Sequence, residues 1–124
     1  MAGYWAVKCG GFGGSIQVST NESAKINVND NNLLIAVNLV DNGKGNASVY
    51  YSDVIESQND IIDWNSVSKR KSIAKLSLKN GILHVFWNGF YDDKTKKYIW
   101  LNDPDFVVAT EGNRDVKMGK CEFK

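Results

Sequence analysis

The sequence is poor in proline, histidine, cysteine and net charge. Its 124 residues include one proline, one histidine and two cysteines, and 15 basic against 14 acidic side chains give a formal net charge of +1. So small a charge does not suit a protein that binds nucleic acid through a strong overall field. The longest apolar run, around residues 33–40, is far shorter than the roughly 20 residues of a membrane-spanning helix. We therefore expect no nucleic-acid partner and no membrane span.

Hydrophobic and aromatic residues are plentiful. They make up 43% and 11% of the chain, too large a share for a disordered protein. A chain of this length has room for one compact core that buries roughly two-thirds of the surface exposed by the unfolded chain. The sequence therefore predicts a single soluble, globular domain over residues 1–124.

Strand chemistry dominates the chain. Apolar residues alternate with polar ones or form short β-branched runs, and Asn, Asp and Gly separate the runs. The candidate strands are residues 4–9, 15–19, 24–28, 33–40, 47–52, 72–79, 82–89, 98–101, 106–110 and 116–122. So many strands in one small domain predict an all-β fold, a small antiparallel β-barrel or β-sandwich of about eight to ten short strands.

Asn80-Gly81 is the strongest turn signal, because both central residues of a two-residue type I′ hairpin need positive φ. The turn fixes the register of the flanking strands. One face is then wholly apolar, with Leu78 opposite Leu83, Leu76 opposite Val85 and Ala74 opposite Trp87. The other face is mixed, with Lys79 opposite Ile82, Ser77 opposite His84, Lys75 opposite Phe86 and Ile73 opposite Asn88. We expect the mixed face either to be half-exposed or, in a sandwich, to pack on a neighbouring sheet.

A second hairpin is predicted beyond the first, with Phe90-Tyr91 and residues 98–100 flanking a charged tip at residues 92–97. Residues 53–71 are the longest stretch without alternation, and such a loop in a small domain is usually partly helical or functional. Residues 63–67 fit one helical turn with Asp63 as its N-cap. The glycine tract at residues 10–14 lacks the lysine of a phosphate-binding loop and predicts a tight connection between strands.

Cys9 and Cys121 lie near opposite ends of the chain, a spacing that fits neither a C-x-x-C redox motif nor a zinc site. We expect a disulfide that joins the first and last strands, with two buried free thiols as the alternative. A disulfide implies an oxidising compartment, so the protein is expected to be periplasmic or secreted. Because no basic and apolar leader precedes the first strand, we expect the signal peptide to have been removed.

Patterns for catalysis and metal binding are weak. His84 faces Ser77, a pair used in nucleophilic catalysis, but a histidine on a mixed strand face is more often a surface residue. Four aspartates surround the second hairpin without the spacing of a calcium loop: Asp92, Asp93, Asp103 and Asp105. Turn formation explains them, and a hydrolase with paired aspartates stays open as a third hypothesis. We expect no enzyme activity, no metal and no cofactor.

Aromatic residues beside the charged tip are the feature that core filling explains least. If Ile82, His84 and Phe86 are exposed together, they form the kind of patch whose aromatic anchors dominate interface energetics. We expect a partner-binding surface made of Trp64, His84, Phe86, Tyr91, Lys94, Tyr98 and Trp100. Tyr and Trp rings also stack on sugars, so a domain that binds carbohydrate or another small ligand is the alternative.

The chain resembles the small periplasmic β-barrel proteins that inhibit C-type lysozymes, in its size, its Y-x-x-x-x-C pattern from Tyr4 to Cys9, its late Cys121 and its short strands. That family contacts lysozyme through a Ser-Gly loop and a Tyr-to-Lys-Gly segment, which have no counterpart here, so no inhibitory residue is transferred. The resemblance implies an inhibitor of a cell-wall hydrolase, and an immunity protein against a periplasmic toxin is a related expectation. Either would be a monomer or weak dimer whose loops at 53–71 and 92–97 occlude the partner's active cleft.

Overall fold

The computed structural model describes residues 1–10, 14–19, 22–29, 33–58, 62–99, 104–110 and 115–121. Short strands make up most of it. The elements, in chain order, are β1 (Gly3–Ala6), β2 (Ser15–Val18), β3 (Ser23–Asn29), β4 (Leu33–Gly43), β5 (Asn46–Ser57), a 3₁₀ turn η1 (Trp64–Ser66), β6 (Ser72–Lys79), β7 (Ile82–Trp87), β8 (Phe90–Asp92), β9 (Lys97–Ile99), a short helix α1 (Asp105–Val108) and β10 (Asp115–Cys121).

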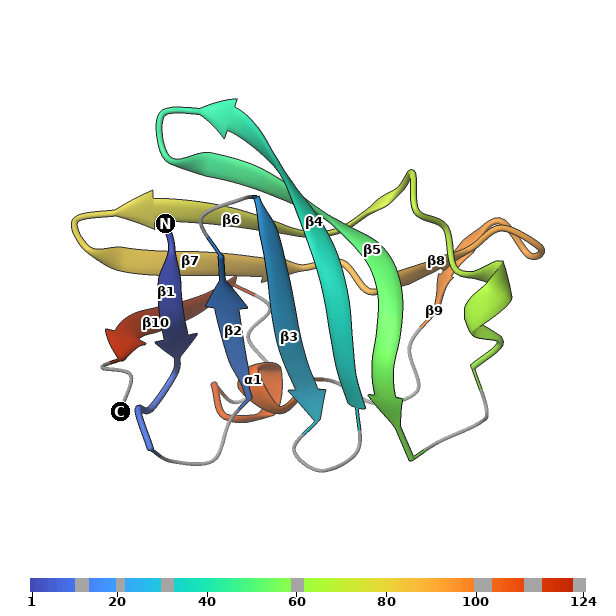
Figure 1. Ribbon diagram of the computed structural model, residues 1–124, viewed down its shortest axis with the longest axis horizontal. Helices are drawn as coiled ribbons and strands as arrows, with labels where there is room; N and C mark the ends of the chain where they lie inside the picture. Colours follow the sequence, from blue (N-terminus) through green and yellow to red (C-terminus); the bar gives the residue numbers. More distant parts are fainter. Residues whose placement is uncertain are drawn as a thin grey trace.

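Eight of these strands form a closed antiparallel barrel in the order β1-β2-β3-β4-β5-β6-β7-β10 (Figure 1). The barrel closes because β1 pairs with both its neighbour β2 and the last strand, Tyr4 lying opposite Gln17 on one side and Cys121 on the other. Consecutive strands are neighbours throughout, apart from the β8–β9 hairpin and α1, which are inserted between β7 and β10. The predicted all-β fold is confirmed, and it is a barrel.

Alternating side chains fill the barrel interior, as the period-2 pattern predicts. The Asn80-Gly81 turn has φ values of 52° and 79°, and it sets the predicted register, including Ala74 opposite Trp87 and Lys75 opposite Phe86. The core draws on every strand of the barrel, and its largest fully buried side chains include Trp87, Ile16, Ile26, Ile35, Leu76, Leu83 and Met118. Each such side chain contributes about 1.5 to 3 kcal/mol through burial of apolar surface.

The predicted strand at residues 106–110 is wrong, because this segment forms the helix α1. The carbonyl of Pro104 accepts hydrogen bonds from the N–H groups of Val107 and Val108, at 2.9 and 3.0 Å. Phe106 is fully buried and meets Trp87 edge-to-face, with ring centroids 5.7 Å apart. A continuous apolar run suits a buried strand and a buried helical turn equally well, so alternation could not distinguish them. Figure 1 shows α1 beside the lower ends of β2 and β3.

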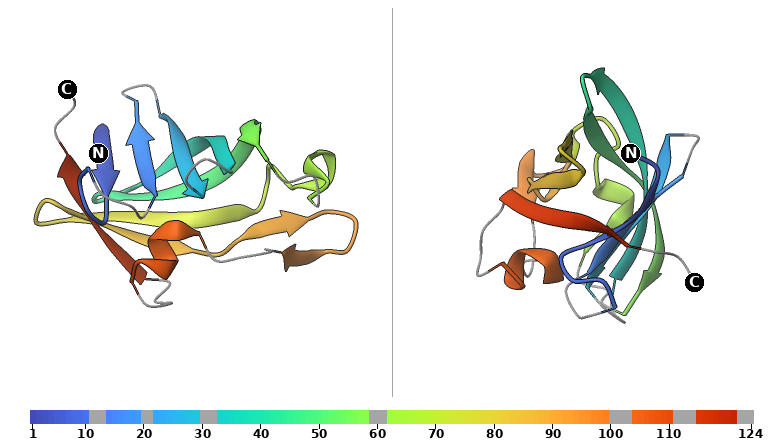
Figure 2. Two further views of the ribbon diagram at one scale, coloured as in Figure 1. Left: turned by 90° about the horizontal axis from the view of Figure 1, so that it is seen from below. Right: turned by 90° about the vertical axis from the view of Figure 1, so that its left-hand side faces the viewer.

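A side lobe, defined as residues 63–71 and 90–99, projects beyond the barrel (Figure 2). Residues 66–68 run beside the β8–β9 hairpin: the N–H of Ser68 donates to the carbonyl of Tyr91, and the N–H of Asp93 donates to the carbonyl of Ser66, both at 2.8 Å. The predicted helical turn is confirmed as η1, and Asp63 caps it by accepting from the N–H of Asn65. The prediction of one long loop over residues 53–71 is wrong at its start, because β5 continues to Ser57.

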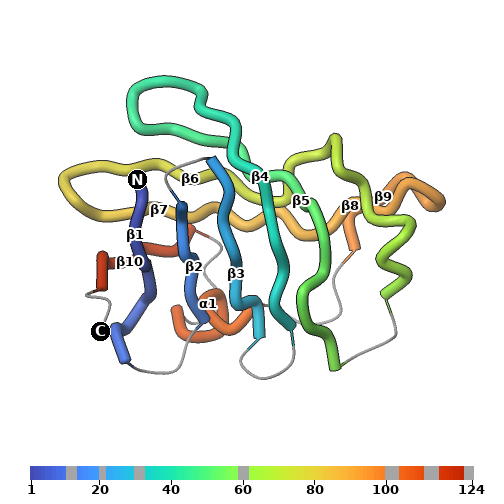
Figure 3. Tube along the Cα trace, viewed as in Figure 1, coloured from blue at the N-terminus to red at the C-terminus, as the bar shows by residue number. Residues whose placement is uncertain are grey.

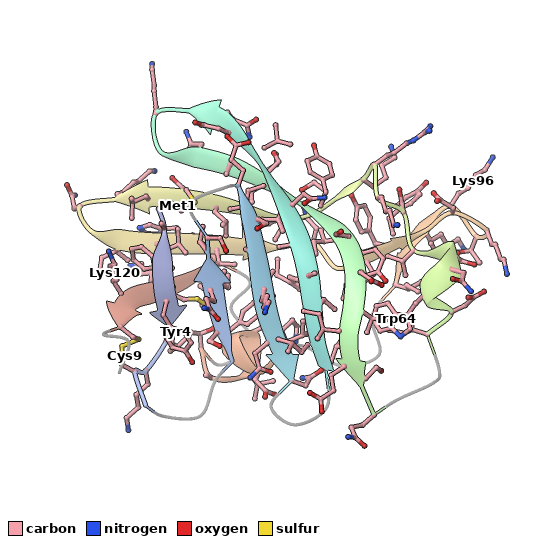
Figure 4. The ribbon with its side chains drawn as sticks, viewed as in Figure 1. Met1, Tyr4, Cys9, Trp64, Lys96 and Lys120 are labelled. Carbon is pink, nitrogen blue, oxygen red and sulfur yellow. A yellow bond between two sulfur atoms is a disulfide. The ribbon has the colours of Figure 1, made fainter. Side chains whose placement is uncertain are left out.

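The disulfide between Cys9 and Cys121 is confirmed, with Cα atoms 5.5 Å apart at a sequence separation of 112. It ties the segment after β1 to the end of β10, at the place where the barrel closes (Figure 4). Among the described residues, no helix is long and apolar enough to cross a membrane. The Cα trace shows β1 and the end of β10 at the same side of the barrel (Figure 3).

Candidate functional site

The outer face of β6, β7 and β10 carries a patch of mixed residues, here called the Phe86 face. Pairing between the three strands sets it out in rows. Lys75, Phe86 and Asp115 form the first row, followed by Ser77, His84 and Lys117, and then by Lys79, Ile82 and Gly119. Side chains paired across antiparallel strands point to the same side of a sheet. The rows therefore present one aromatic ring, one aliphatic side chain and three lysines on one outer surface.

The Phe86 face is exposed to solvent. Phe86 is 48% exposed and Ile82 is 39% exposed, while His84 is partly covered. The sequence left open whether this face packs on a second sheet, and in the barrel it points outward. A groove of about 320 Å³ runs along it, with Asn42 and Asn46 of the β4–β5 hairpin on one wall. An exposed aromatic ring beside a groove is a typical anchor position for a protein partner.

His84 lies beside a carboxylate on this face. Its Nδ1 is 3.9 Å from Oδ1 of Asp115, which is within ion-pair range when the imidazole is protonated but too long for a hydrogen bond. Ser77 faces His84 across the β6–β7 pair, as predicted. At this distance the carboxylate is an ion-pair partner of the imidazole and not its hydrogen-bond acceptor. The arrangement suits a polar contact surface.

The mixed face ends where the side lobe covers it. Ile73 was expected on this half-exposed face but is fully buried. The N–H groups of Asn88 and Gly89 donate to its carbonyl at 2.8 and 3.2 Å, so the chain turns across the start of β6 before it enters β8. Tyr98 lies over the same end of the strand, and its hydroxyl donates to the carbonyl of Ser72 at 3.1 Å. The start of β6, at Ser72 and Ile73, is therefore the boundary between the Phe86 face and the lobe.

Two of the expected contact residues, Tyr91 and Tyr98, form an aromatic pair on the lobe. They lie opposite each other in the β8–β9 hairpin, with ring centroids 5.1 Å apart and planes at 78°. Tyr98 is 43% exposed. The ammonium of Lys71 lies 5.4 Å from the centroid of Tyr91, within cation–π range. The pair thus forms a partly exposed aromatic surface with a cation beside it.

Lys94, the third of these residues, braces the tip of the hairpin. Its Nζ lies 2.9 Å from Oδ2 of Asp63, which also accepts a hydrogen bond from the hydroxyl of Ser66 at 2.9 Å. These two hydrogen bonds hold the pKa of the Asp63 carboxyl below its usual value, and the same carboxylate raises the pKa of Lys94. The ion pair is exposed to solvent and therefore contributes orientation more than stability.

Trp64 serves mainly as the packing centre of the lobe. It is half-buried, stacks on Tyr51 with centroids 5.7 Å apart, and meets Phe90 edge-to-face at 5.2 Å. Burial in this cluster raises the pKa of the Tyr51 phenol, and the nearby charge of Asp53 adds to the effect. Trp100, the last expected contact residue, lies outside the described residues. Tyr51 and Lys71 were not among the expected contact residues, because their contacts with Trp64 and Tyr91 join segments that are distant in the sequence. Lys75 lies opposite Phe86, as the predicted register has it.

Positive charge is concentrated on the lobe. It contains six basic residues and three acidic ones, and Lys94 neutralises Asp63, so the lobe carries +3 while the whole chain carries +1. The three lysines of the Phe86 face, with Asp115 as their acidic neighbour, have the same sign. An anionic partner surface would meet both regions favourably.

The acidic residues near the second hairpin do not assemble into a metal centre in the described part of the chain, where no group of three His, Cys, Asp or Glu side chains is placed to hold an ion. Asp103 lies outside the described residues. Asp92 instead shapes the hairpin tip by accepting a hydrogen bond from the N–H of Lys94 at 2.9 Å. Asp105 accepts one from the side-chain amide of Asn29 at 3.2 Å.

Comparison with known proteins gives no match to a protein-family model, to a curated protein or to a solved structure.

Proposed function

We propose that this protein is an exported binding protein, an inhibitor or immunity protein that occludes the active cleft of a cell-wall hydrolase or toxin. The observation that carries the proposal is the side lobe, a braced hairpin with an exposed aromatic pair and a cationic tip that projects beyond the barrel (Figure 2). The Cys9–Cys121 disulfide supports the exported location, because such bonds persist in oxidising compartments.

The lobe and the Phe86 face together offer an area suited to a protein partner. Tyr98 contacts Ser72, three residues before Lys75 on β6, so about 10 Å of strand separates the aromatic pair from the first row of the face. Specific interfaces bury about 800 Å² on each partner. A surface that runs from the groove beside Phe86 to the hairpin tip matches an interface of that kind, with Phe86 and Tyr98 as its anchors.

Two contacts order the hairpin tip before any partner binds. The N–H of Lys96 donates to the carbonyl of Asp92 at 2.8 Å, and Lys94 is bound to Asp63. Side chains that are fixed before binding lose less entropy when a partner arrives. Glycan-cleaving hydrolases keep paired carboxylates in their clefts, and the cationic tip complements such a cleft in charge.

The experiment is a binding and activity panel. The purified oxidised protein is tested by interferometry against C-type lysozymes, other cell-wall hydrolases and periplasmic toxins, and each binder is assayed for residual activity. We expect binding of at least one catalyst, with Lys96→Glu weakening it about tenfold because Lys96 is at the tip. Lys25→Glu, the same charge change on exposed Lys25 of β3, serves as the matched control. Equal effects of the two variants would overturn the proposed surface.

Carbohydrate is the second candidate ligand, and the exposed ring of Tyr98 favours it. Aromatic rings next to polar side chains bind sugars by stacking and hydrogen bonding. A glycan array separates the two candidates. Saturable glycan binding that Tyr98→Ala abolishes, without any protein partner in the panel, would replace the first proposal by the second.

A further inference from the structure

The two ends of the barrel differ. At one end α1 packs across the opening: Phe106 is fully buried against Trp87, and Gly14 leaves it room, because a Cβ on Gly14 would lie 3.2 Å from Cδ2 of Phe106. At the other end the chain forms an open mouth with a cavity of about 390 Å³. Eight-stranded barrels are just wide enough to hold one small ligand, and their mouths are common ligand sites.

The mouth has an apolar floor and a polar rim. Its floor is formed by Val18, Leu39, Ala47 and Leu78, of which the first three are buried. The rim is formed by residues of the turns and strand ends, among them Ser19, Glu22, Asp41, Lys44 and Asn46. This composition is typical of a small-molecule site, in which apolar walls supply affinity and a few polar groups fix orientation.

Hydrogen bonds between the loops fix the rim. The N–H of Leu39 donates to the carbonyl of Glu22 at 2.8 Å, which ties the β2–β3 connection to β4. The N–H of Leu78 donates to the carbonyl of Gly45, also at 2.8 Å, which ties the β4–β5 turn to β6. A rim held in this way loses little freedom when a ligand binds.

Two rim residues have unusual backbone conformations. Glu22 has φ of 63° and Lys44 has φ of 55°, values that residues with a side chain rarely adopt. Backbone strain of this kind is concentrated at ligand sites and turns. Both strained residues of the mouth, Glu22 and Lys44, therefore carry a charge.

One carboxylate of the rim is available to a cationic ligand. The Glu22 carboxylate makes no hydrogen bond or ion pair with another described residue, while one oxygen of Asp41 accepts from the N–H of Gly43 at 2.7 Å. Glu22 and Asp41 thus place two carboxylates on the rim, beside Lys44 and Met1. We propose that the barrel mouth binds a small amphipathic amine, with its apolar part on the floor and its ammonium group beside Glu22. Figure 4 shows Met1, which lines the mouth, and Lys96, on the lobe, at opposite ends of the molecule, so the mouth is separate from the hairpin tip. It adjoins the groove of the Phe86 face, because Asn46 and Ala47 line both.

The test uses three probes with the same chain and different head groups: n-octylammonium, n-octanol and n-octanoate, each below its micellar concentration. Binding is followed by the methyl resonances of Val18, Leu39 and Leu78 in NMR spectra of the whole chain. We expect saturable shifts that are strongest with octylammonium, weaker with octanol and weakest with octanoate. Absence of saturation with every probe, shifts confined to other regions, or preference for octanoate would overturn the proposal.

Variants of the rim make the test specific. Glu22→Gln is expected to lower the affinity for octylammonium about fivefold to tenfold and to remove its advantage over octanol. Glu56→Gln, the same change on exposed Glu56 of β5, is the matched control and should change nothing. Ala47→Leu adds bulk to the floor and should weaken all three probes. An unchanged octylammonium affinity in Glu22→Gln would overturn the assigned head group. The lobe variant Lys96→Glu should bind the probes as the wild type does, so this test fails or succeeds independently of the cationic hairpin tip.

Discussion

The hydroxyl of Tyr98 donates a hydrogen bond to the carbonyl of Ser72 at 3.1 Å, and this contact fixes β9 to the first residue of β6. The neighbouring residue, Ile73, is fully buried although strand alternation directs it outward. The side lobe is therefore joined to the barrel wall at the start of β6. This contact places the aromatic pair beside the strand that carries Lys75 of the Phe86 face.

Removal of the Tyr98 hydroxyl should loosen the lobe alone. In Tyr98→Phe the ring remains and the hydrogen bond is lost, which costs about 0.5 to 1 kcal/mol at so exposed a site. Native-state hydrogen exchange should show this loss at the amides of β8 and β9, while the amides of β4 keep their protection. Unchanged exchange in the hairpin would show that the contact does not anchor it.

The packing of Trp64 should decide whether the lobe is ordered. Trp64→Ala removes the contacts with Tyr51 and Phe90 and should lower the free energy of unfolding by about 2 to 4 kcal/mol. Trp64→Phe should cost less, because it keeps an aromatic ring and deletes an indole N–H that has no hydrogen-bond acceptor among the described residues. Urea denaturation measures both values. Equal losses of unfolding free energy in Trp64→Ala and Trp64→Phe would contradict the stabilising role of the aromatic ring at position 64.

Acid should weaken the ion pair between Asp63 and Lys94 at the hairpin tip. The pKa of the Asp63 carboxyl is lowered in the folded protein, so its stabilising effect is present above its ordinary value of 3.8 and is lost as the pH falls through the lower folded value. At the alkaline end, the raised pKa of Lys94 means that this ammonium keeps its contribution up to its ordinary value of 10.5 and loses it above that. Hydrogen exchange of the tip amides against pH should show the acid transition in the wild type. Asp63→Asn should lack it, and a persistent transition there would assign it to another group.

Most of the barrel could be predicted from local sequence. Asn80-Gly81 admits one tight turn, and alternation on both sides of it leaves one register that buries Leu76, Val85 and Trp87 together. The two cysteines near the chain ends fit a barrel in which the first and last strands are neighbours. These features depend on short-range chemistry, which a single sequence displays.

The candidate sites depend on contacts between distant segments, which a single sequence does not display. Lys71 lies over Tyr91 and Tyr98 reaches Ser72 only because residues 66–68 run beside β8. The mouth is likewise assembled from separate turns, including those that carry Glu22 and Lys44. The helix α1 was mistaken for a strand because its apolar run has no period of its own.

The disulfide should be a major source of stability. Replacement of both Cys9 and Cys121 by Ser should lower the free energy of unfolding by about 4 kcal/mol, because the bridge closes a loop of more than 100 residues in the unfolded chain. Denaturation of the wild type in the presence of a reductant should give the same loss. A double variant as stable as the oxidised wild type would show that strand pairing alone closes the barrel.

The most direct test of the proposed function is a titration of the activity of a partner enzyme from the panel with this protein and with Phe86→Ala. Occlusion predicts that activity falls linearly to its minimum at one equivalent of wild type. Phe86→Ala, which removes an exposed ring without disturbing the core, should need at least about tenfold more protein, in keeping with the loss of an interface anchor. Full activity of the bound enzyme at saturation would contradict occlusion, and equal titration curves for the two proteins would remove the Phe86 face from the interface.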